Sequence, residues 1–103
     1  MKYTDEELRL APRVAEIMGL VSYEKAQRMP TLEQCLDWLE EQKWGAIYLH
    51  RPRPGASWFC HVARAEVVNV KGTGRFVLNE KEGRGDTKRE AAYRAVIAVV
   101  EGK

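Results

Sequence analysis

The C-terminal segment constrains the fold more than any other part of the chain. Gly83-Arg84-Gly85 predicts a flexible loop, and Thr87 and Glu90 then stand three residues apart, which is the spacing of a helix capping box. Apolar residues follow at intervals of three and four, and several of them are alanines, which leave one side of the helix thin. The pattern predicts a helix over residues 88–101 that ends at Gly102 and lies close against a sheet.

Two earlier segments also predict helices. Thr4 and Glu7 have the capping-box spacing, and a helical pattern of apolar residues then runs to Gly19. Pro12 lies inside that pattern, so we expect the helix to be kinked or split there. A second helical pattern opens at Thr31, again with a capping box, and carries an acidic outer face. We expect both helices to cover the sheet.

From Ala46 onward the apolar residues alternate with a period of two, which is the period of a strand. We expect extended segments at residues 46–50, 57–63, 66–70 and 75–80. The connections between them are too short for parallel crossovers, so the predicted sheet is antiparallel, with three to four strands. The chain is therefore predicted to form a single α+β domain over residues 1–103, with the element order α-α-β-β-β-β-α.

Composition places the chain among packed globular domains that do not enter a membrane. Of its 103 residues, 45% are hydrophobic, and no apolar run approaches the roughly 20 residues that span a bilayer. Cys35 and Cys60 are the only cysteines, too few for a disulfide framework, and the first residues are acidic and polar rather than a secretion signal. We therefore expect a cytoplasmic protein with two buried thiols.

The residue types that carry catalysis do not converge in this sequence. His50 and His61 are the only histidines, whereas a metal site needs three or four ligands. Cys60 alternates to the opposite face of its strand from His61, so the two cannot act as a nucleophile and its base. No nucleotide-binding loop or hydrolase motif occurs. We expect a protein that is not an enzyme and that holds no metal or cofactor.

Positive charge is concentrated in the strand region. Residues 51–85 hold seven Lys and Arg against three Glu, a net charge of +4, whereas residues 1–50 have a net charge of −3. The candidate binding residues are Arg51, Arg53, Arg84, Lys88 and Arg89, with the aromatic residues Tyr48, Trp58 and Phe59 near the first two. Cations interleaved with aromatic rings bind nucleic-acid backbones, but Arg, Trp and Tyr also dominate protein interfaces. The sequence leaves both uses open, and a homodimer as well.

Short motifs spread over most of the chain resemble those of the small phage "ABA sandwich" proteins. The matching segments are RVAEIMGL (residues 13–20), LDW (36–38), SWF (57–59), DT (86–87) and AAYRA (91–95). This chain departs from the family in having Leu20 where an aromatic residue is expected, and in a longer strand segment. The resemblance implies an α-β-α layered sandwich and a phage or prophage protein that works in the host cytoplasm. It implies no activity.

A second resemblance is confined to the C-terminal third. Gly83-Arg84-Gly85-Asp86-Thr87-Lys88-Arg89-Glu90-Ala91 resembles the segment that opens the last helix of double-stranded-RNA-binding domains, where lysines bridge phosphates. The resemblance implies that Lys88 and Arg89 contact phosphates, while the family's third lysine position is Ala92 here. Residues 51–55 replace the family's Gly-Pro-x-His loop.

These observations together predict a small phage accessory protein that acts by binding rather than by catalysis. The leading hypothesis is a protein partner, with inhibition of a host or defence component as one such role. The alternative is nucleic acid, either double-stranded RNA or DNA, bound by the basic loop and the N-terminus of the last helix.

Overall fold

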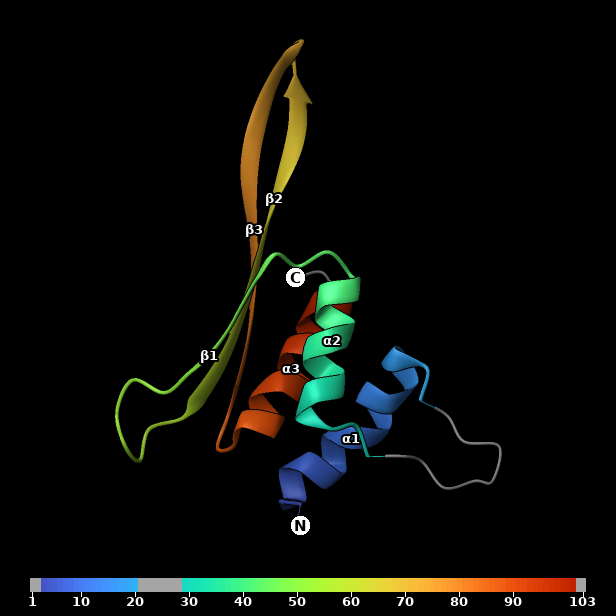
Figure 1. The fold of residues 1–103 in the computed structure, drawn as a ribbon, viewed down its shortest axis with the longest axis vertical. Helices are drawn as coiled ribbons and strands as arrows, with labels where there is room; N and C mark the ends of the chain where they lie inside the picture. The colour runs from blue at the N-terminus through green and yellow to red at the C-terminus, as the bar shows by residue number, and fades with distance from the viewer. Residues whose placement is uncertain (1–2, 21–28, 102–103) are drawn as a thin grey trace.

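The computed structural model describes residues 3–20 and 29–101, which form three helices and one antiparallel sheet (Figure 1). The elements are α1 (Asp5–Met18), α2 (Leu32–Glu41), β1 (Ala46–His50), β2 (Trp58–Val70), β3 (Thr73–Gly85) and α3 (Lys88–Glu101). The strands lie in the order β1-β2-β3. The α+β class and the antiparallel sheet are therefore confirmed, as are the bounds predicted for β1 and α3.

The sheet has three strands, the lower of the two numbers predicted. The segments expected at 57–63 and 66–70 are one continuous strand, β2, because Arg64 and Ala65 between them carry no turn signal. β3 likewise runs further than predicted, from Thr73 to Gly85, so the loop predicted at Gly83-Arg84-Gly85 is wrong and these residues belong to the strand. The predicted order α-α-β-β-β-β-α was wrong by one strand, and the observed order is α-α-β-β-β-α.

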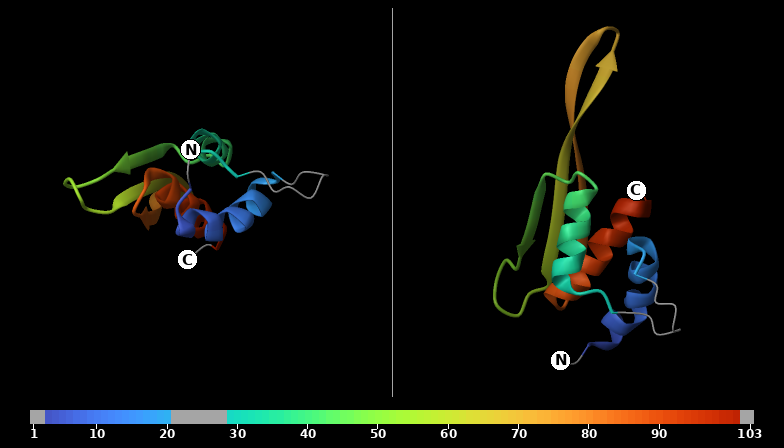
Figure 2. Two further views of the ribbon diagram at one scale, coloured as in Figure 1. Left: turned by 90° about the horizontal axis from the view of Figure 1, so that it is seen from below. Right: turned by 45° about the vertical axis from the view of Figure 1, so that its right-hand side comes forward.

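All three helices lie on one side of the sheet in the part of the chain that the structure describes (Figure 2). We call the sheet face toward the helices the inner face and the opposite one the outer face. Cys60 and Val62 of β2 point inward and are fully buried, whereas Tyr48 of β1 is 58% exposed on the outer face. The described elements therefore form a sheet covered on one side and not the α-β-α sandwich that the sequence predicted.

α3 is the central element, since it contacts α1, α2 and both long strands. Its residues Ala91, Ala92, Tyr93, Ala95 and Val96 are fully buried. Gly83 of β3 faces this thin side so closely that an added Cβ would lie 2.2 Å from the Ala91 carbonyl oxygen and 2.2 Å from the Ala95 nitrogen. The predicted close contact between the last helix and the sheet is confirmed.

The predicted N-caps form, but only α2 has both halves of a capping box, between Thr31 and Gln34. At α3, Thr87 accepts a hydrogen bond from the Glu90 amide (3.1 Å), while the Glu90 carboxylate accepts one from Asp86. α1 is one helix that continues through Pro12. Gly102, expected to end α3, lies outside the described residues.

The core joins the inner face of the sheet to all three helices. Its largest contributors besides α3 are Leu10, Val14, Leu39, Trp44 and Val62. Cys35 of α2 and Cys60 of β2 are both free thiols within this cluster and have no exposed surface. Burial raises the pKa of each thiol to about 12. The prediction of two buried thiols is confirmed.

The ribbon of β2 and β3 extends beyond the rest of the molecule (Figures 1 and 2). β1 pairs with β2 only as far as Ala63. Arg64 is the last residue that contacts the core: its guanidinium lies over the Trp44 ring and donates a hydrogen bond to the Gln42 carbonyl oxygen. We call residues 65–78, which pair only with one another, the arm. The radius of gyration of 15.4 Å exceeds the value of about 13 Å for a compact chain of this length.

Candidate nucleic-acid interface

Four of the five predicted binding residues meet at one end of the sheet. The β1–β2 loop carries Arg51 and Arg53, and the register of β2 with β3 places Phe59 opposite Arg84. The same register places Trp58 opposite Gly85, next to the start of α3. We call this surface the basic end and define it as Arg51, Arg53, Arg84 and Lys88, together with Trp58 and Phe59.

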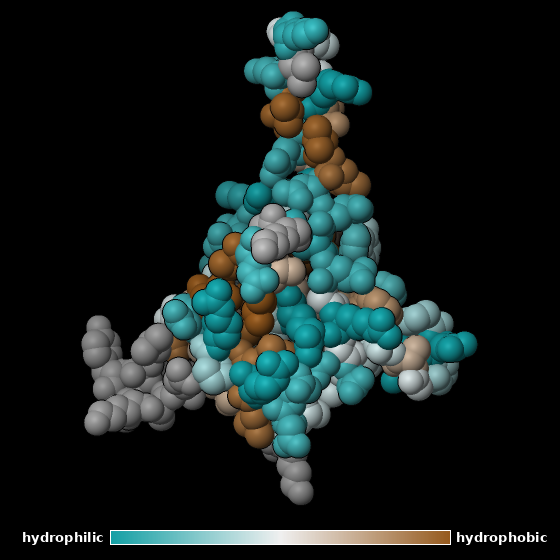
Figure 3. Space-filling model, turned by 180° about the vertical axis from the view of Figure 1, so that it is seen from behind, coloured by the Kyte–Doolittle hydropathy of each residue, from teal (hydrophilic) through white to brown (hydrophobic). Residues whose placement is uncertain are grey.

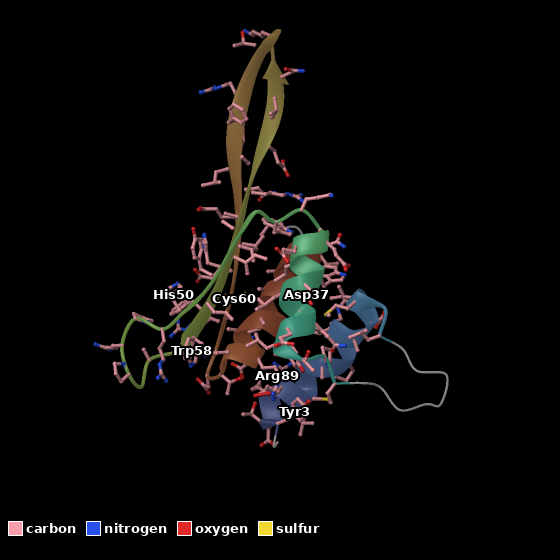
Figure 4. The ribbon with its side chains drawn as sticks, viewed as in Figure 1. Tyr3, Asp37, His50, Trp58, Cys60 and Arg89 are labelled. Carbon is pink, nitrogen blue, oxygen red and sulfur yellow. The ribbon has the colours of Figure 1, made fainter. Side chains whose placement is uncertain are left out.

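Trp58 holds two cations on the inner side of the basic end. The guanidinium carbon of Arg51 lies 4.9 Å from the ring centroid, and the Lys88 ammonium nitrogen lies 4.8 Å from it. Both distances fall within the range of a cation–π interaction. Trp58 therefore brings a loop cation next to a cation at the N-terminus of α3, where the helix dipole also favours an anion (Figure 4).

Phe59 organises the outer side of the same end. The Arg84 guanidinium lies 5.6 Å from its ring centroid, and the His50 ring stacks on it at 5.4 Å. Because Trp58 and Phe59 are consecutive residues of a strand, their rings point to opposite faces. The cations therefore surround the end of the sheet on both faces.

The charges of the basic end are not neutralised by carboxylates. Four arginines elsewhere are each ion-paired with a glutamate at 2.6–2.9 Å, namely Arg9, Arg64, Arg89 and Arg94. Within residues 3–20 and 29–101, no such pair forms at Arg51, Arg53, Arg84 or Lys88, and all four residues are exposed. The basic end is thus a cationic surface available to an external anion.

Arg89, the fifth predicted residue, faces away from this surface. Its guanidinium donates to Glu7 Oε2 at 2.6 Å, and Glu7 Oε1 accepts from the Thr87 hydroxyl at 2.9 Å. The Glu7 side chain is only 2% exposed and that of Arg89 only 16%. Arg89 thus ties α1 to α3, and its guanidinium lies over the ring of Tyr3 (Figure 4). The resemblance to double-stranded-RNA-binding domains places that family's three phosphate-contacting positions at Lys88, Arg89 and Ala92. Of these three residues, only Lys88 is exposed to solvent.

Sequence reasoning did not identify the acidic partners on α1. Glu6 accepts a hydrogen bond from Arg94 at 2.9 Å, so both Arg94 and Arg89 anchor α3 to α1. The sequence did contain a signal for a buried ion pair at the neighbouring residue, Glu7. Glu7 falls on the same helical face as Leu10, Ala11 and Val14, which are buried. A carboxylate in an apolar stripe predicts a buried cation partner.

An open groove of about 800 Å³ lies between α1, α3 and the end of β3. Four arginines and four acidic residues line it, and they are Arg9, Arg13, Arg84, Arg94, Glu82, Asp86, Glu90 and Glu101. Leu10 and Ile97 add apolar surface. Because the charges balance, the groove has no preference for an anion, and it shares only Arg84 with the basic end.

The two histidines have separate surroundings. The His61 imidazole lies between two carboxylates, 3.4 Å from Glu80 and 3.8 Å from Glu82, while His50 stacks on Phe59.

Across the described ranges, no group of three or more His, Cys, Asp or Glu side chains could hold a metal ion. None of the described helices has the length and apolar character to cross a bilayer.

Comparison of the chain with models of protein families, with curated proteins and with solved structures found no match. The two resemblances stated above therefore stay predictions.

Proposed function

We propose that this protein is a non-catalytic nucleic-acid-binding module and that its basic end contacts the phosphate backbone. The observation that carries the proposal is the group of four exposed cations that no carboxylate pairs among the described residues. Neutralising phosphates releases condensed counterions, which is the main source of affinity in such interfaces. Trp58 and Phe59 add aromatic surface on which a base or a sugar can pack.

The charge distribution also orients the ligand. The outer face of α2 carries four exposed or half-exposed carboxylates, Glu33, Asp37, Glu40 and Glu41. A polyanion is repelled from that side and attracted to the basic end, so the molecule has one favourable direction of approach. An acidic protein partner would be attracted to the basic end by the same electrostatic field. A nucleic acid fits better, because its regularly spaced phosphates can contact cations on both faces of the sheet end.

A duplex is the first ligand to test. The order from α2 to α3, a helix followed by three antiparallel strands and a helix, agrees with that of double-stranded-RNA-binding domains. Lys88 stands at the position where that family contacts phosphate, while Arg89 is engaged with Glu7. We therefore expect a smaller footprint on the duplex than the family resemblance alone implies.

Fluorescence anisotropy with short double-stranded RNA, double-stranded DNA and single-stranded DNA tests the proposal. The informative variant is Arg51→Gln with Lys88→Gln, which removes both cations over Trp58. Its matched control is Lys43→Gln with Arg75→Gln, which changes the net charge equally at exposed positions away from the basic end. Each titration is run at about 50 mM and about 200 mM salt.

We expect wild-type binding that weakens with salt, and a loss of about tenfold or more in the Arg51/Lys88 variant. The salt slope of that variant should also fall by about two, one for each phosphate contact removed. The control should bind like wild type. Absence of binding to all three nucleic acids at low salt, or equal losses in the two variants, would overturn the proposal.

A protein partner is the second candidate, and the groove is the observation that favours it. Its alternating charges beside Leu10 and Ile97 suit a peptide segment that carries both charged and apolar side chains. The test is capture of a defined complex that survives moderate salt and that Arg13→Glu disrupts. The phage accessory role, including inhibition of a host or defence component, rests on the family resemblance alone.

A further inference from the structure

The arm exposes apolar side chains that no described part of the chain covers. On its outer face the register pairs Val67 with Phe76 and Ala65 with Leu78. Phe76 is 81% exposed, Val67 65% and Leu78 61%, which are the three highest values among the large hydrophobic residues. Figure 3 shows apolar side chains gathered on the arm below its tip. We call Ala65, Val67, Phe76 and Leu78 the arm patch.

Leaving this patch in water is unfavourable. Burying large apolar side chains is favourable, and monomeric proteins rarely expose contiguous patches of them. The patch also lies on a ribbon whose outer strand, β3, has no partner at its free edge within the described chain. Proteins usually protect such an edge with Pro, a bulge or charges. Phe76, Val77 and Leu78 are consecutive and uncharged.

We propose that a second copy of this chain covers the arm patch, with the two arms stacked outer face to outer face in antiparallel directions about a two-fold axis. The axis lies between the two arms, perpendicular to their strands, at the level of the rung that pairs Glu66 with Val77, the centre of the patch. Phe76 of one copy then lies over Leu78 of the other, and Val67 lies over Ala65. The same surface contributes from both copies, as an isologous interface requires.

The charges at the two ends of the arm select this occupant and this direction. Lys71 lies five residues from Glu66 toward the tip, and Glu82 lies five residues from Val77 toward the core. At about 3.4 Å per residue, both are roughly 17 Å from the axis. Antiparallel stacking therefore places Lys71 of each copy near His61 of the other, whose imidazole is flanked by the half-exposed carboxylates of Glu80 and Glu82.

A parallel arrangement of the same two faces would place like charges over one another. The glutamates of the two copies would lie at the same level along the ribbon, and so would the two Lys71 side chains, so like charges would approach one another, which is unfavourable. The opposite face of the arm is less suited to self-association. There Glu66 accepts hydrogen bonds from Arg64 and Asn79, which lie just below the arm, so polar groups separate Val77 from the core.

The fold leaves room for this dimer. The outer face carries no helix in the described part of the chain, so two copies can approach along the arms without a clash between helices. The interface is only two strands wide, which places its area at the low end of specific interfaces. We therefore expect a weak dimer that forms at tens of micromolar and above.

Sedimentation equilibrium of the full chain between about 5 and 300 µM tests the inference. We expect wild type to move from monomer to dimer over this range, and Phe76→Lys to weaken association by at least about tenfold. Val77→Lys is the matched control, since it introduces the same charge one residue along the strand on the opposite face. A wild-type protein that stays monomeric throughout, or equal effects of the two substitutions, would overturn the proposal.

A charge swap tests the direction of stacking. Lys71→Glu should weaken the dimer about tenfold, because two like-charge contacts replace two ion pairs. Combining Lys71→Glu with Glu82→Lys should restore association, because the two residues that lie near each other across the dimer again carry opposite charges. If Lys71→Glu leaves the dimer unchanged, the antiparallel arrangement is wrong. Phe76→Lys should leave nucleic-acid binding intact, so failure of this inference is distinguishable from failure of the proposed function.

Discussion

The base and the arm of the β2–β3 ribbon belong to the same two strands and share one continuous register, yet only the base is part of the core. At the base, Gly83 and the alanines of α3 let helix and sheet approach closely. Along the arm, the inner face carries Glu66, which accepts hydrogen bonds from Arg64 and Asn79 just below the arm, and no described helix lies opposite. Strand pairing therefore does not decide which half is buried. Small side chains at the contact with α3 decide it.

The largest loss of stability should come from adding a side chain at the close contact between α3 and the sheet. Gly83→Ala places a methyl group against backbone atoms of Ala91 and Ala95, which cannot move without displacing α3. We expect a loss of about 3 kcal/mol or more in the free energy of unfolding, measured by urea denaturation. Gly74→Ala is the control on the arm, where the nearest atoms are 3.8 Å away. Comparable losses in the two variants would contradict the distinction between base and arm.

The next largest loss of stability should come from removing the Arg89–Glu7 ion pair, which anchors α1 to α3. Arg89→Ala leaves the Glu7 carboxylate buried without its cation, and breaking a buried pair costs about 3 kcal/mol. Thermal unfolding should show the loss directly. Arg53→Ala at the basic end, an exposed position, should change stability by less than about 0.5 kcal/mol. An Arg89→Ala protein as stable as wild type would show that this pair does not hold α1 in place.

Alkaline pH should destabilise the core through its two buried thiols, Cys35 of α2 and Cys60 at the base of the ribbon. Burial raises the folded-state pKa of Cys35 and Cys60 from 9.0 to about 12, so the unfolded chain ionises first. Their stabilising effect is complete below pH 9 and is lost between pH 9 and 12, by about 1 kcal/mol for each thiol at pH 10.

The same thiols should not react with an aromatic disulfide reagent at pH 8 while the protein is folded. A cysteine introduced on the arm by Ala65→Cys should react at once at protein concentrations below those at which dimers form, since Ala65 is exposed in the monomer. Rapid reaction of Cys60 in the folded protein would mean that the base opens as easily as the arm.

The smallest effect on stability should come from removing the arm. Joining Ala65 to Leu78 through Asn-Gly makes a two-residue hairpin turn. Because residues 66–77 pair only with one another and extend away from the described helices, the free energy of unfolding should stay within about 1 kcal/mol of the wild-type value, measured well below the concentrations at which dimers form. A protein that no longer folds would show that the arm supports the core.

Local patterns in the sequence predicted the parts of the fold that local contacts determine. The cap at Thr87, the alanines of α3 and the alternation of β1 were sufficient to place those elements. The arm was missed because the polar residues at 64 and 66 interrupt the inward alternation, and a strand that leaves the core loses its hydrophobic pattern. The interruption was interpreted as a connection between two strands.

The candidate site was predictable only in part, for a related reason. Arg51, Arg53, Arg84 and Lys88 were identified from charge and neighbouring aromatics, and the register of the strands brings them together. Whether a given arginine faces solvent depends on partners far away in sequence. Arg89 meets Glu7, 82 residues earlier, and no pattern near Arg89 specifies that contact.

The most direct test of the account compares the two ends of the ribbon in one binding assay. Anisotropy with double-stranded RNA at low salt and low protein concentration is measured for wild type, the shortened-arm variant and the Arg51→Gln/Lys88→Gln variant. The account predicts that the shortened arm binds within about twofold of wild type, while the basic-end variant binds about tenfold more weakly or worse. Loss of binding in the shortened-arm variant, with binding retained in the basic-end variant, would contradict it.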